Sequence, residues 1–181
     1  MITNMKKEQG NSKPLIYIGV GTTLLFIVLI YLGSQQNKKA SVTLAGEELP
    51  VETAVHVQRG SLPEVQDPPT SGEHYGDGVA GPGVHNEPVE DGLLVHSLEH
   101  GAVILSYDPE KLDEATIGQL KSTFTEKFQG KKIMVPRSGM SVPIIMTSWG
   151  QILKLEQIDE AKMIEFMDTN NDHGPEKAPA Y

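Results

Sequence analysis

Apolar residues recur most regularly in the second half of the chain, where helical and extended periodicities alternate. Ile117, Leu120, Phe124 and Phe128 lie three or four positions apart, which is the spacing of one face of an α-helix. The pattern predicts a helix within residues 112–128 whose apolar face packs on the core.

Short apolar runs bounded by turn residues predict the strands of the domain. A helix between two strands implies a right-handed parallel crossover, and a turn at Gly150 implies a hairpin. We therefore expect an α+β fold in which helices pack on a mixed sheet, in the order β-α-β-β-β-α. The expected strands and final helix occupy residues 102–107, 132–136, 142–149 and 151–155, and then residues 159–168.

Glycine and proline interrupt the pattern in the first half of the domain. A brief strand is expected at residues 54–57, and the composition of residues 60–88 predicts a Gly/Pro-rich loop region. Loops of that length in a compact domain are usually functional or disordered. His74 and His85 lie within this one, which favours a functional loop.

A single uncharged apolar run extends from Leu15 to Gly33. At about 19 residues it is long enough to cross a hydrocarbon core of roughly 30 Å. A cleaved signal peptide is the alternative, but no small-x-small cleavage site precedes Lys38 and the run exceeds a usual signal h-region. Lysines in the N-terminal tail favour a cytoplasmic N-terminus. We therefore expect a single-pass protein of the cell membrane whose C-terminal domain lies outside the cytoplasm.

The expected organisation has five parts along the chain. The folded part is expected to be separable from the membrane part, because a polar tether follows the apolar run. The parts are a cytoplasmic tail (1–14), a transmembrane anchor (15–33), a tether (34–52), an extracytoplasmic domain (53–176) and a tail (177–181).

Composition narrows the function classes. The 181 residues leave room for one domain of ordinary size besides the anchor. The net charge of −9 and the scattered positions of the 15 Lys and Arg residues argue against nucleic-acid binding. Cysteine is absent, which excludes disulfides and thiolate ligands and is compatible with a place outside the cytoplasm. We expect a monomer, and the sequence identifies no protein partner.

Chemically active side chains are densest in residues 93–102, where His96, Glu99 and His100 fall close together. In a helix the two histidines would share a face at i and i+4, with Glu99 beside them. In a strand they would share a face that excludes Glu99. Either way the imidazoles keep the spacing of metal ligands. The segment also fits H-x-x-E-H, in which two histidines hold zinc and the glutamate is the base, but Gly101 and a predicted strand replace the long helix of that enzyme class.

Two other histidines are candidate ligands. His74 follows Pro68-Pro69 and a turn at Gly72, which would hold its imidazole in place. His56 is a further candidate, although a histidine in such a short apolar pattern is more often an ordinary core or surface residue. His173 lies in a stretch that fails the calcium-loop pattern after its first positions.

Several motifs together resemble a known family. They are Pro-Pro-Thr-Ser-Gly-Glu-His at 68–74, Leu94–Val103 with its His-Ser-Leu-Glu-His-Gly core, Pro136-Arg137, Thr147–Gly150 and Gly174–Glu176. In this combination the chain resembles, over about residues 53–176, a bacterial family of domains of unknown function, family 3105 of that series. Members are typically single-span membrane or exported proteins, so the resemblance implies an anchored domain and no particular reaction. At His85 the family usually has tyrosine, which makes His85 the weakest candidate ligand.

The leading interpretation is an extracytoplasmic metal-binding domain without an assigned catalytic residue. His74, His96 and His100 would be the ligands, Glu99 would accept the second N–H of an imidazole, and His56 would be a further candidate. Three neutral imidazoles suit copper or zinc. One alternative is a metal-dependent hydrolase of the cell envelope with Glu99 as the base. Another is a structural histidine cluster that binds no metal and serves a protein partner.

Overall fold

The computed structural model describes residues 27–28 and 43–177. The chain divides into two compact units, Met1–Ser41 and Val42–Tyr181, and the fold below is that of the second. Ile27 and Val28 are helical, and the rest of the predicted span, residues 15–33, lies outside the described residues. No helix that the described residues form is both long and apolar enough to cross a bilayer.

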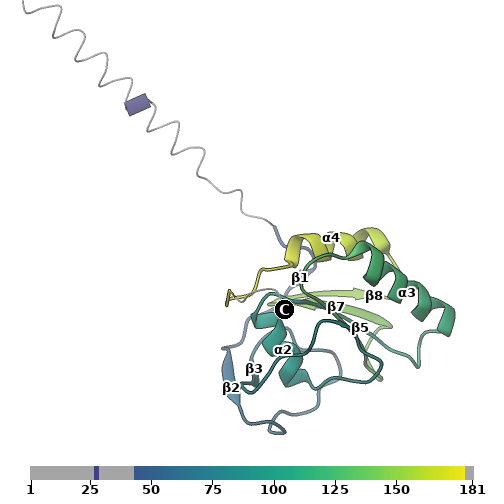
Figure 1. The fold of residues 1–181 in the computed structure, drawn as a ribbon, viewed down its shortest axis with the longest axis horizontal. Coiled ribbons are helices and arrows are strands. Elements are labelled where there is room, and N and C mark those ends of the chain that lie inside the picture. The colour runs from purple at the N-terminus through teal and green to yellow at the C-terminus, as the bar shows by residue number, and fades with distance from the viewer. Residues whose placement is uncertain (1–26, 29–42, 178–181) are drawn as a thin grey trace, which may run out of the picture. The chain divides into compact units, whose positions relative to one another are not determined.

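A six-stranded mixed sheet is the centre of the domain, and a separate two-stranded parallel sheet lies beside it (Figure 1). The large sheet consists of β1 (Glu47–Glu48), β4 (Gly83–Val84), β5 (Val103–Tyr107), β6 (Lys132–Pro136), β7 (Ile144–Ser148) and β8 (Gln151–Leu155). The small sheet consists of β2 (Val55–Val57) and β3 (Glu73–Tyr75), and the helices are α2 (Asp91–Glu99), α3 (Glu114–Lys127) and α4 (Glu160–Asn170).

The strand order of the large sheet is β1-β8-β7-β5-β6-β4. Helix α3 connects β5 to β6, which pair in parallel, while β7 and β8 form an antiparallel hairpin. The run from β5 to α4 therefore confirms the predicted α+β class and the order β-α-β-β-β-α. Helix α3 begins after Asp113, whose carboxylate accepts the Thr116 N–H at 2.7 Å.

Each face of the large sheet is covered by a different layer. In β5, Val103, Leu105 and Tyr107 pack with buried residues of α3 and α4, whereas Ile104, on the opposite face, packs with Leu98 of α2. This division follows from the alternation of side chains along a strand. Figure 1 shows α3 and α4 on one side of the sheet and α2 with β2 and β3 on the other.

In three parts of the fold, the structure decides what the sequence left open or adds strands that it did not indicate. Residues 91–99 are helical, which decides between the helical and extended interpretations left open for this stretch. The long loop region at residues 60–88 contains β3 and β4. Strand β1 pairs with β8, so the sheet includes two residues of the stretch 34–52 that was assigned to a tether. Both β1 residues are exposed glutamates, so no apolar alternation marks them as a strand.

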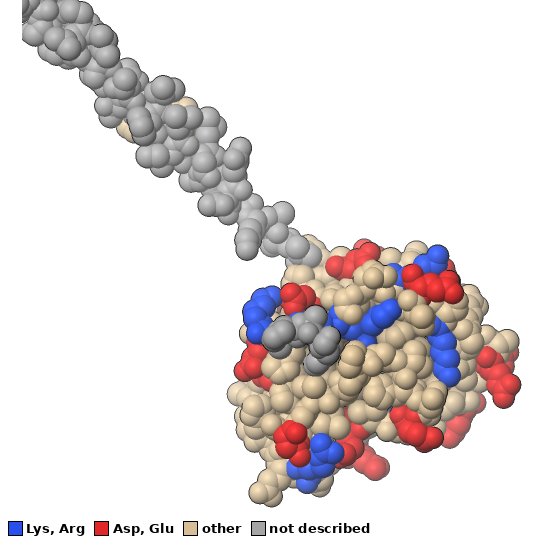
Figure 2. Space-filling model, viewed as in Figure 1, with Lys and Arg blue, Asp and Glu red and all other residues tan. Residues whose placement is uncertain are grey.

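Charged side chains are mixed over the surface in view. Figure 2 shows Lys and Arg side chains separated by acidic or uncharged residues on this face. The net charge of the chain is −9. The face in view therefore carries no continuous basic surface among the residues that are described.

Candidate metal centre

The small parallel sheet places two histidines side by side. The register of β2 and β3 pairs His56 with His74, and residues paired in this way project from the same face of a sheet. Their ring centroids are 4.8 Å apart, with the ring planes nearly perpendicular at 87°. His74 is fully buried, whereas His56 is exposed. The pair therefore presents one imidazole to the interior and one toward solvent.

Helix α2 packs against β3 and completes the group. The His96 ring lies 5.3 Å from the His56 ring and 5.0 Å from the His74 ring. Glu99 is one helical turn further on, and its Oε2 is 3.0 Å from Nε2 of His74. Each of these four residues offers one ligand atom, and the four atoms all lie within 4.8 Å of one another. We call His56, His74, His96 and Glu99 the four-residue cluster, and it could hold a metal ion.

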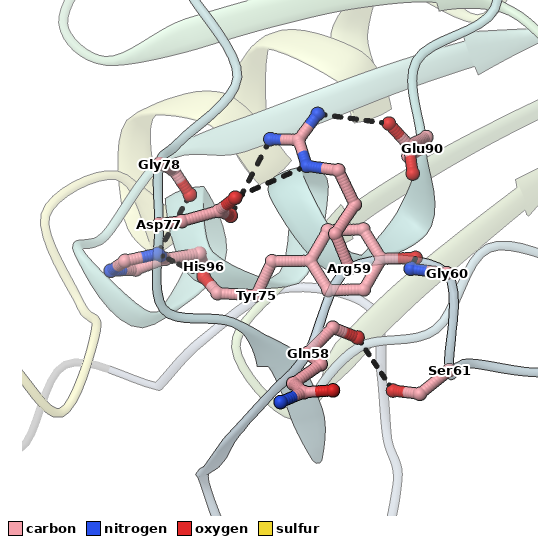
Figure 3. Close-up of polar contacts among 9 residues, drawn as sticks. All are labelled: Gln58, Arg59, Gly60, Ser61, Tyr75, Asp77, Gly78, Glu90 and His96. Carbon is pink, nitrogen blue, oxygen red and sulfur yellow. Dashed lines mark hydrogen bonds and ion pairs between the residues drawn. The ribbon is translucent and has the colours of Figure 1, made fainter.

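Backbone carbonyls orient two of these imidazoles through their Nδ1 atoms. Nδ1 of His74 lies 2.9 Å from the Gly72 oxygen, and Nδ1 of His96 lies 2.7 Å from the Tyr75 oxygen and 2.8 Å from the Gly78 oxygen (Figure 3). A carbonyl oxygen only accepts hydrogen bonds, so each Nδ1 is an N–H donor, and in the neutral imidazole Nε2 is then the nitrogen that bears the lone pair. Metal-bound histidines are typically oriented in this way, with the second N–H donated to a carbonyl or carboxylate.

The 3.0 Å contact between His74 and Glu99 lacks the geometry of a hydrogen bond. Nε2 of His74 and Oε2 of Glu99 are both buried and have no hydrogen-bond partner among the described residues, although the distance satisfies that of an ion pair. In the tautomer set by Gly72, both atoms present lone pairs. Two buried acceptors that face each other are unfavourable unless a cation lies between them.

Two glycines make room for the cluster. A Cβ atom at Gly76 would lie 3.0 Å from Cγ of His56, and one at Gly92 would lie 2.6 Å from the Tyr75 ring. The first contact is tight and the second is a clash. The absence of side chains at Gly76 and Gly92 therefore allows the His56 ring to approach residue 76 and the Tyr75 ring to approach α2.

The loop after β2 is tied to the segment that supplies the carbonyls for His96 (Figure 3). Arg59 forms an ion pair with Asp77 at 3.3 Å and another with Glu90 at 3.1 Å. Its guanidinium also lies over the Tyr75 ring, 5.6 Å from the centroid. The Tyr75 hydroxyl accepts the Gly60 N–H at 3.1 Å. Arg59 is thus a positioning residue for the segment from Tyr75 to Gly78.

A second arginine holds the first turn of α2. Arg137 donates to both carboxylate oxygens of Asp91, and to the Val65 and Gln66 oxygens at 2.5 and 3.2 Å. Sequence reasoning singled out Arg137 only as part of a family motif and did not single out Arg59. The one available signal was the position of Arg137 directly after the buried run at 132–136.

His100 belongs to a neighbouring group. The helix ends at Glu99, so His100 lies just beyond it, with its ring 4.8 Å from that of His96. Nδ1 of His100 is 3.8 Å from Oε2 of Glu176, and Glu99, His100 and Glu176 form a second set of ligand atoms within 4.8 Å of one another. Burial lowers the pKa of His100 below its usual value, and the nearby His96 lowers it further.

Of the three predicted ligands, the structure thus brings together His74 and His96, joined by His56, the further candidate, and by Glu99, which was expected only to orient an imidazole. His100 is adjacent but falls in the second group. Two other histidines bond to nearby backbone oxygens, His85 to Gly81 at 2.8 Å and His173 to Asn171 at 2.9 Å. Neither is part of a described group of metal-ligand side chains.

Comparisons with known proteins agree with the motifs. The sequence profile of a family described as protein of unknown function (DUF3105) matches residues 47–180, which is most of the chain. No curated protein and no solved structure gives a significant match. The chain therefore belongs to the DUF3105 family.

Proposed function

We propose that this domain binds a transition-metal ion, zinc or copper, through the four-residue cluster. His56, His74 and His96 supply imidazole nitrogens, and Glu99 supplies a carboxylate oxygen. Three nitrogens and one oxygen form a common donor set for Zn²⁺ and Cu²⁺. Thiolate ligands are excluded because the chain has no cysteine.

The observation that carries this proposal is the contact between Nε2 of His74 and Oε2 of Glu99. Donor atoms at roughly 2.0–2.1 Å from a tetrahedral zinc lie about 3.3 Å from one another, close to the 3.0 Å found here. An imidazolium–carboxylate pair could have the same separation, but it would direct an N–H at the oxygen, and neither atom makes a hydrogen bond within the described residues. Two lone pairs directed at one ion account for both facts.

The position of Glu99 also changes the role expected from the sequence. Glu99 was expected to accept the second N–H of an imidazole. His74 and His96 instead direct Nδ1 at backbone oxygens, which leaves Glu99 free to act as a ligand. A carboxylate that binds the ion is a poor general base for a bound water, so this arrangement favours metal binding over the hydrolase alternative.

The proposal includes a place outside the cytoplasm, anchored by Leu15–Gly33. Its support is the uncharged apolar run, the lysines before it and the absence of cysteine. Deletion of residues 1–40 should move the protein from the membrane fraction to the soluble fraction as a monomer. A truncated chain that still sediments with membranes would contradict the anchor.

The metal proposal is tested by competition with a chromophoric chelator on the purified full-length chain. We expect tight binding of Zn²⁺ or Cu²⁺, which His74→Ala and His96→Ala should each abolish. His85→Ala and His173→Ala are matched controls, because those rings bond to nearby carbonyls away from the cluster. Metal affinity in His74→Ala equal to that of the unaltered chain would reject the proposal.

A further inference from the structure

The second group of ligand side chains shares one member with the first. Glu99 belongs to the four-residue cluster and also to the set it forms with His100 and Glu176. Nδ1 of His100 is buried and has no hydrogen-bond partner in the described part of the chain. Its 3.8 Å separation from Oε2 of Glu176 is too long for a hydrogen bond. This imidazole nitrogen therefore points toward a carboxylate without bonding to it.

The C-terminal segment is built against the end of α2, which delivers Glu176 to this place. The Glu176 N–H donates to the Glu99 oxygen at 3.1 Å, and the Asp172 N–H donates to the Gly101 oxygen at 2.8 Å. Gly174 passes so close that a Cβ atom there would overlap the Glu99 carbonyl. These backbone contacts fix the segment independently of the Glu176 side chain. The position of its carboxylate next to Glu99 and His100 is thus a result of the fold.

Negative charge gathers at this end of α2. The C-terminus of a helix carries a partial negative charge, which disfavours carboxylates nearby. Glu99 is the last residue of α2 and is 5% exposed, and Glu176 adds a second carboxylate. Lys131 supplies one positive charge, and its ammonium donates to the His100 oxygen and to Asp172, each at 2.8 Å. Lys177 also contacts Asp172. Among the described residues, Glu99, Glu176, Asp172 and the helix terminus thus face Lys131 and Lys177.

We infer that Glu99 bridges two metal ions, one in the four-residue cluster and a second, divalent ion bound by His100 and Glu176. The inference rests on the proposed function, because the first ion is the one proposed above. Bridging carboxylates and separations of about 3.5–4 Å are usual in two-metal centres. The second site has one imidazole and two carboxylates, a more oxygen-rich set than the first, and Glu176 is 59% exposed. The second ion therefore binds more weakly than the first and exchanges with solvent more readily.

The test is the stoichiometry of Zn²⁺ on the purified full-length chain, followed by electron paramagnetic resonance of the Cu²⁺ form. We expect two equivalents of Zn²⁺ with distinct affinities. The Cu²⁺ signal of the first equivalent should weaken when the second binds, because neighbouring copper ions couple magnetically. Glu176→Gln should remove the second equivalent and the coupling while the first ion binds as before. His100→Gln should do the same, and Glu126→Gln on α3 is the matched control.

The outcomes separate the two proposals. A single equivalent at saturation, or two equivalents retained in both Glu176→Gln and His100→Gln, would overturn the bridged pair and leave the first site standing. No binding by the unaltered chain, or undiminished binding by His74→Ala, would overturn both. Circular dichroism of the Glu176→Gln chain before metal addition shows whether the fold is intact. If that chain were unfolded, the His100→Gln result would decide.

Discussion

The two faces of the large sheet are stabilised in different ways. Against α3 and α4, the buried side chains are mainly apolar, with Phe124, Phe128 and Phe166 among the largest, and the buried polar side chains of Thr123 and Asn170 are hydrogen-bonded. On the α2 side, the layer includes buried polar atoms of His74 and Glu99 without hydrogen-bond partners among the described residues. On the first face, apolar burial is the main source of stability and the buried polar groups are already paired. On the second face, the proposed metal ion would compensate these polar atoms, so we expect the stability of that face to depend on the metal concentration.

The largest expected effect tests the apolar face. Phe124→Ala should lower the free energy of unfolding by about 3–5 kcal/mol, because a buried aromatic ring is lost and a cavity remains. Phe124 is 2% exposed in the core under α3. Urea denaturation with and without Zn²⁺ measures the loss. A loss that changed with Zn²⁺ would show that the two faces are not independent.

Metal addition tests the other face. At a free Zn²⁺ concentration of about 100 times the dissociation constant, the unaltered chain should gain about 2.7 kcal/mol in its free energy of unfolding. The gain should vanish with a chelator and be absent in His74→Ala, because that substitution removes a buried donor of the cluster. Thermal denaturation at fixed protein concentration gives the comparison. Equal Tm values with and without Zn²⁺ would show that the α2 face, like the face under α3 and α4, is stabilised independently of the metal.

An intermediate effect is expected where α2 is held to its surroundings. Arg137→Met should lower the free energy of unfolding by about 1–3 kcal/mol, because Asp91 and the Val65 oxygen lose charge-assisted hydrogen bonds. Zn²⁺ affinity should also fall, because α2 carries two members of the cluster. Arg137→Lys keeps the charge but not the paired hydrogen bonds, so its stability and Zn²⁺ affinity should lie between those of the unaltered chain and of Arg137→Met. Unchanged affinity in Arg137→Met would show that α2 is positioned by its apolar contacts alone.

The smallest expected effect is on the stability of the protein at acidic pH. Partial burial raises the pKa of Asp67, but hydrogen bonds from Lys154 and Ser141 outweigh it, and the net pKa is below the usual 3.8. A carboxyl group with a lowered folded-state pKa stabilises the protein above its unfolded pKa, and this contribution is lost as the pH falls through the folded value. The stability difference between the unaltered chain and Asp67→Asn should therefore be full at neutral pH and should shrink below about pH 4. A difference that is constant from neutral pH to about pH 3 would contradict it.

The regular half of the fold was predictable because each element has a strong local signal. The runs at Lys132–Pro136 and Gln151–Leu155 became strands with the predicted bounds. Helices α3 and α4 agree with the prediction within about two residues, which is the usual uncertainty of helix ends. Their starts follow from aspartate caps at Asp113 and Asp159.

The other half depends on contacts between distant residues, which no local pattern contains. Strands β1 and β4 have two residues each, too few to show any periodicity. For α2, the packing of Leu94 and Leu98 on the sheet decides for the helix, and that contact forms only once the sheet exists.

The candidate site shows the same division. His74 and His96 were expected to act together, and the structure places them together. His56 joins them only through the register of β2 and β3, which depends on pairing across a loop. His100 keeps its i, i+4 relation to His96, since its N–H donates to the His96 oxygen, but its ring falls in the second group, with Glu176.

Gly76 gives the cluster an evolutionary signature. Its missing side chain is what lets the His56 ring lie against the backbone there, since a Cβ atom would come within 3.0 Å of the ring. A substitution at residue 76 would therefore displace the His56 ring while every ligand residue is unchanged. Among related sequences, residues 56 and 76 should consequently vary together, and a lineage that gains a side chain at 76 should soon lose the histidine at 56. A position with no functional group of its own would then mark which relatives keep the complete set of donors.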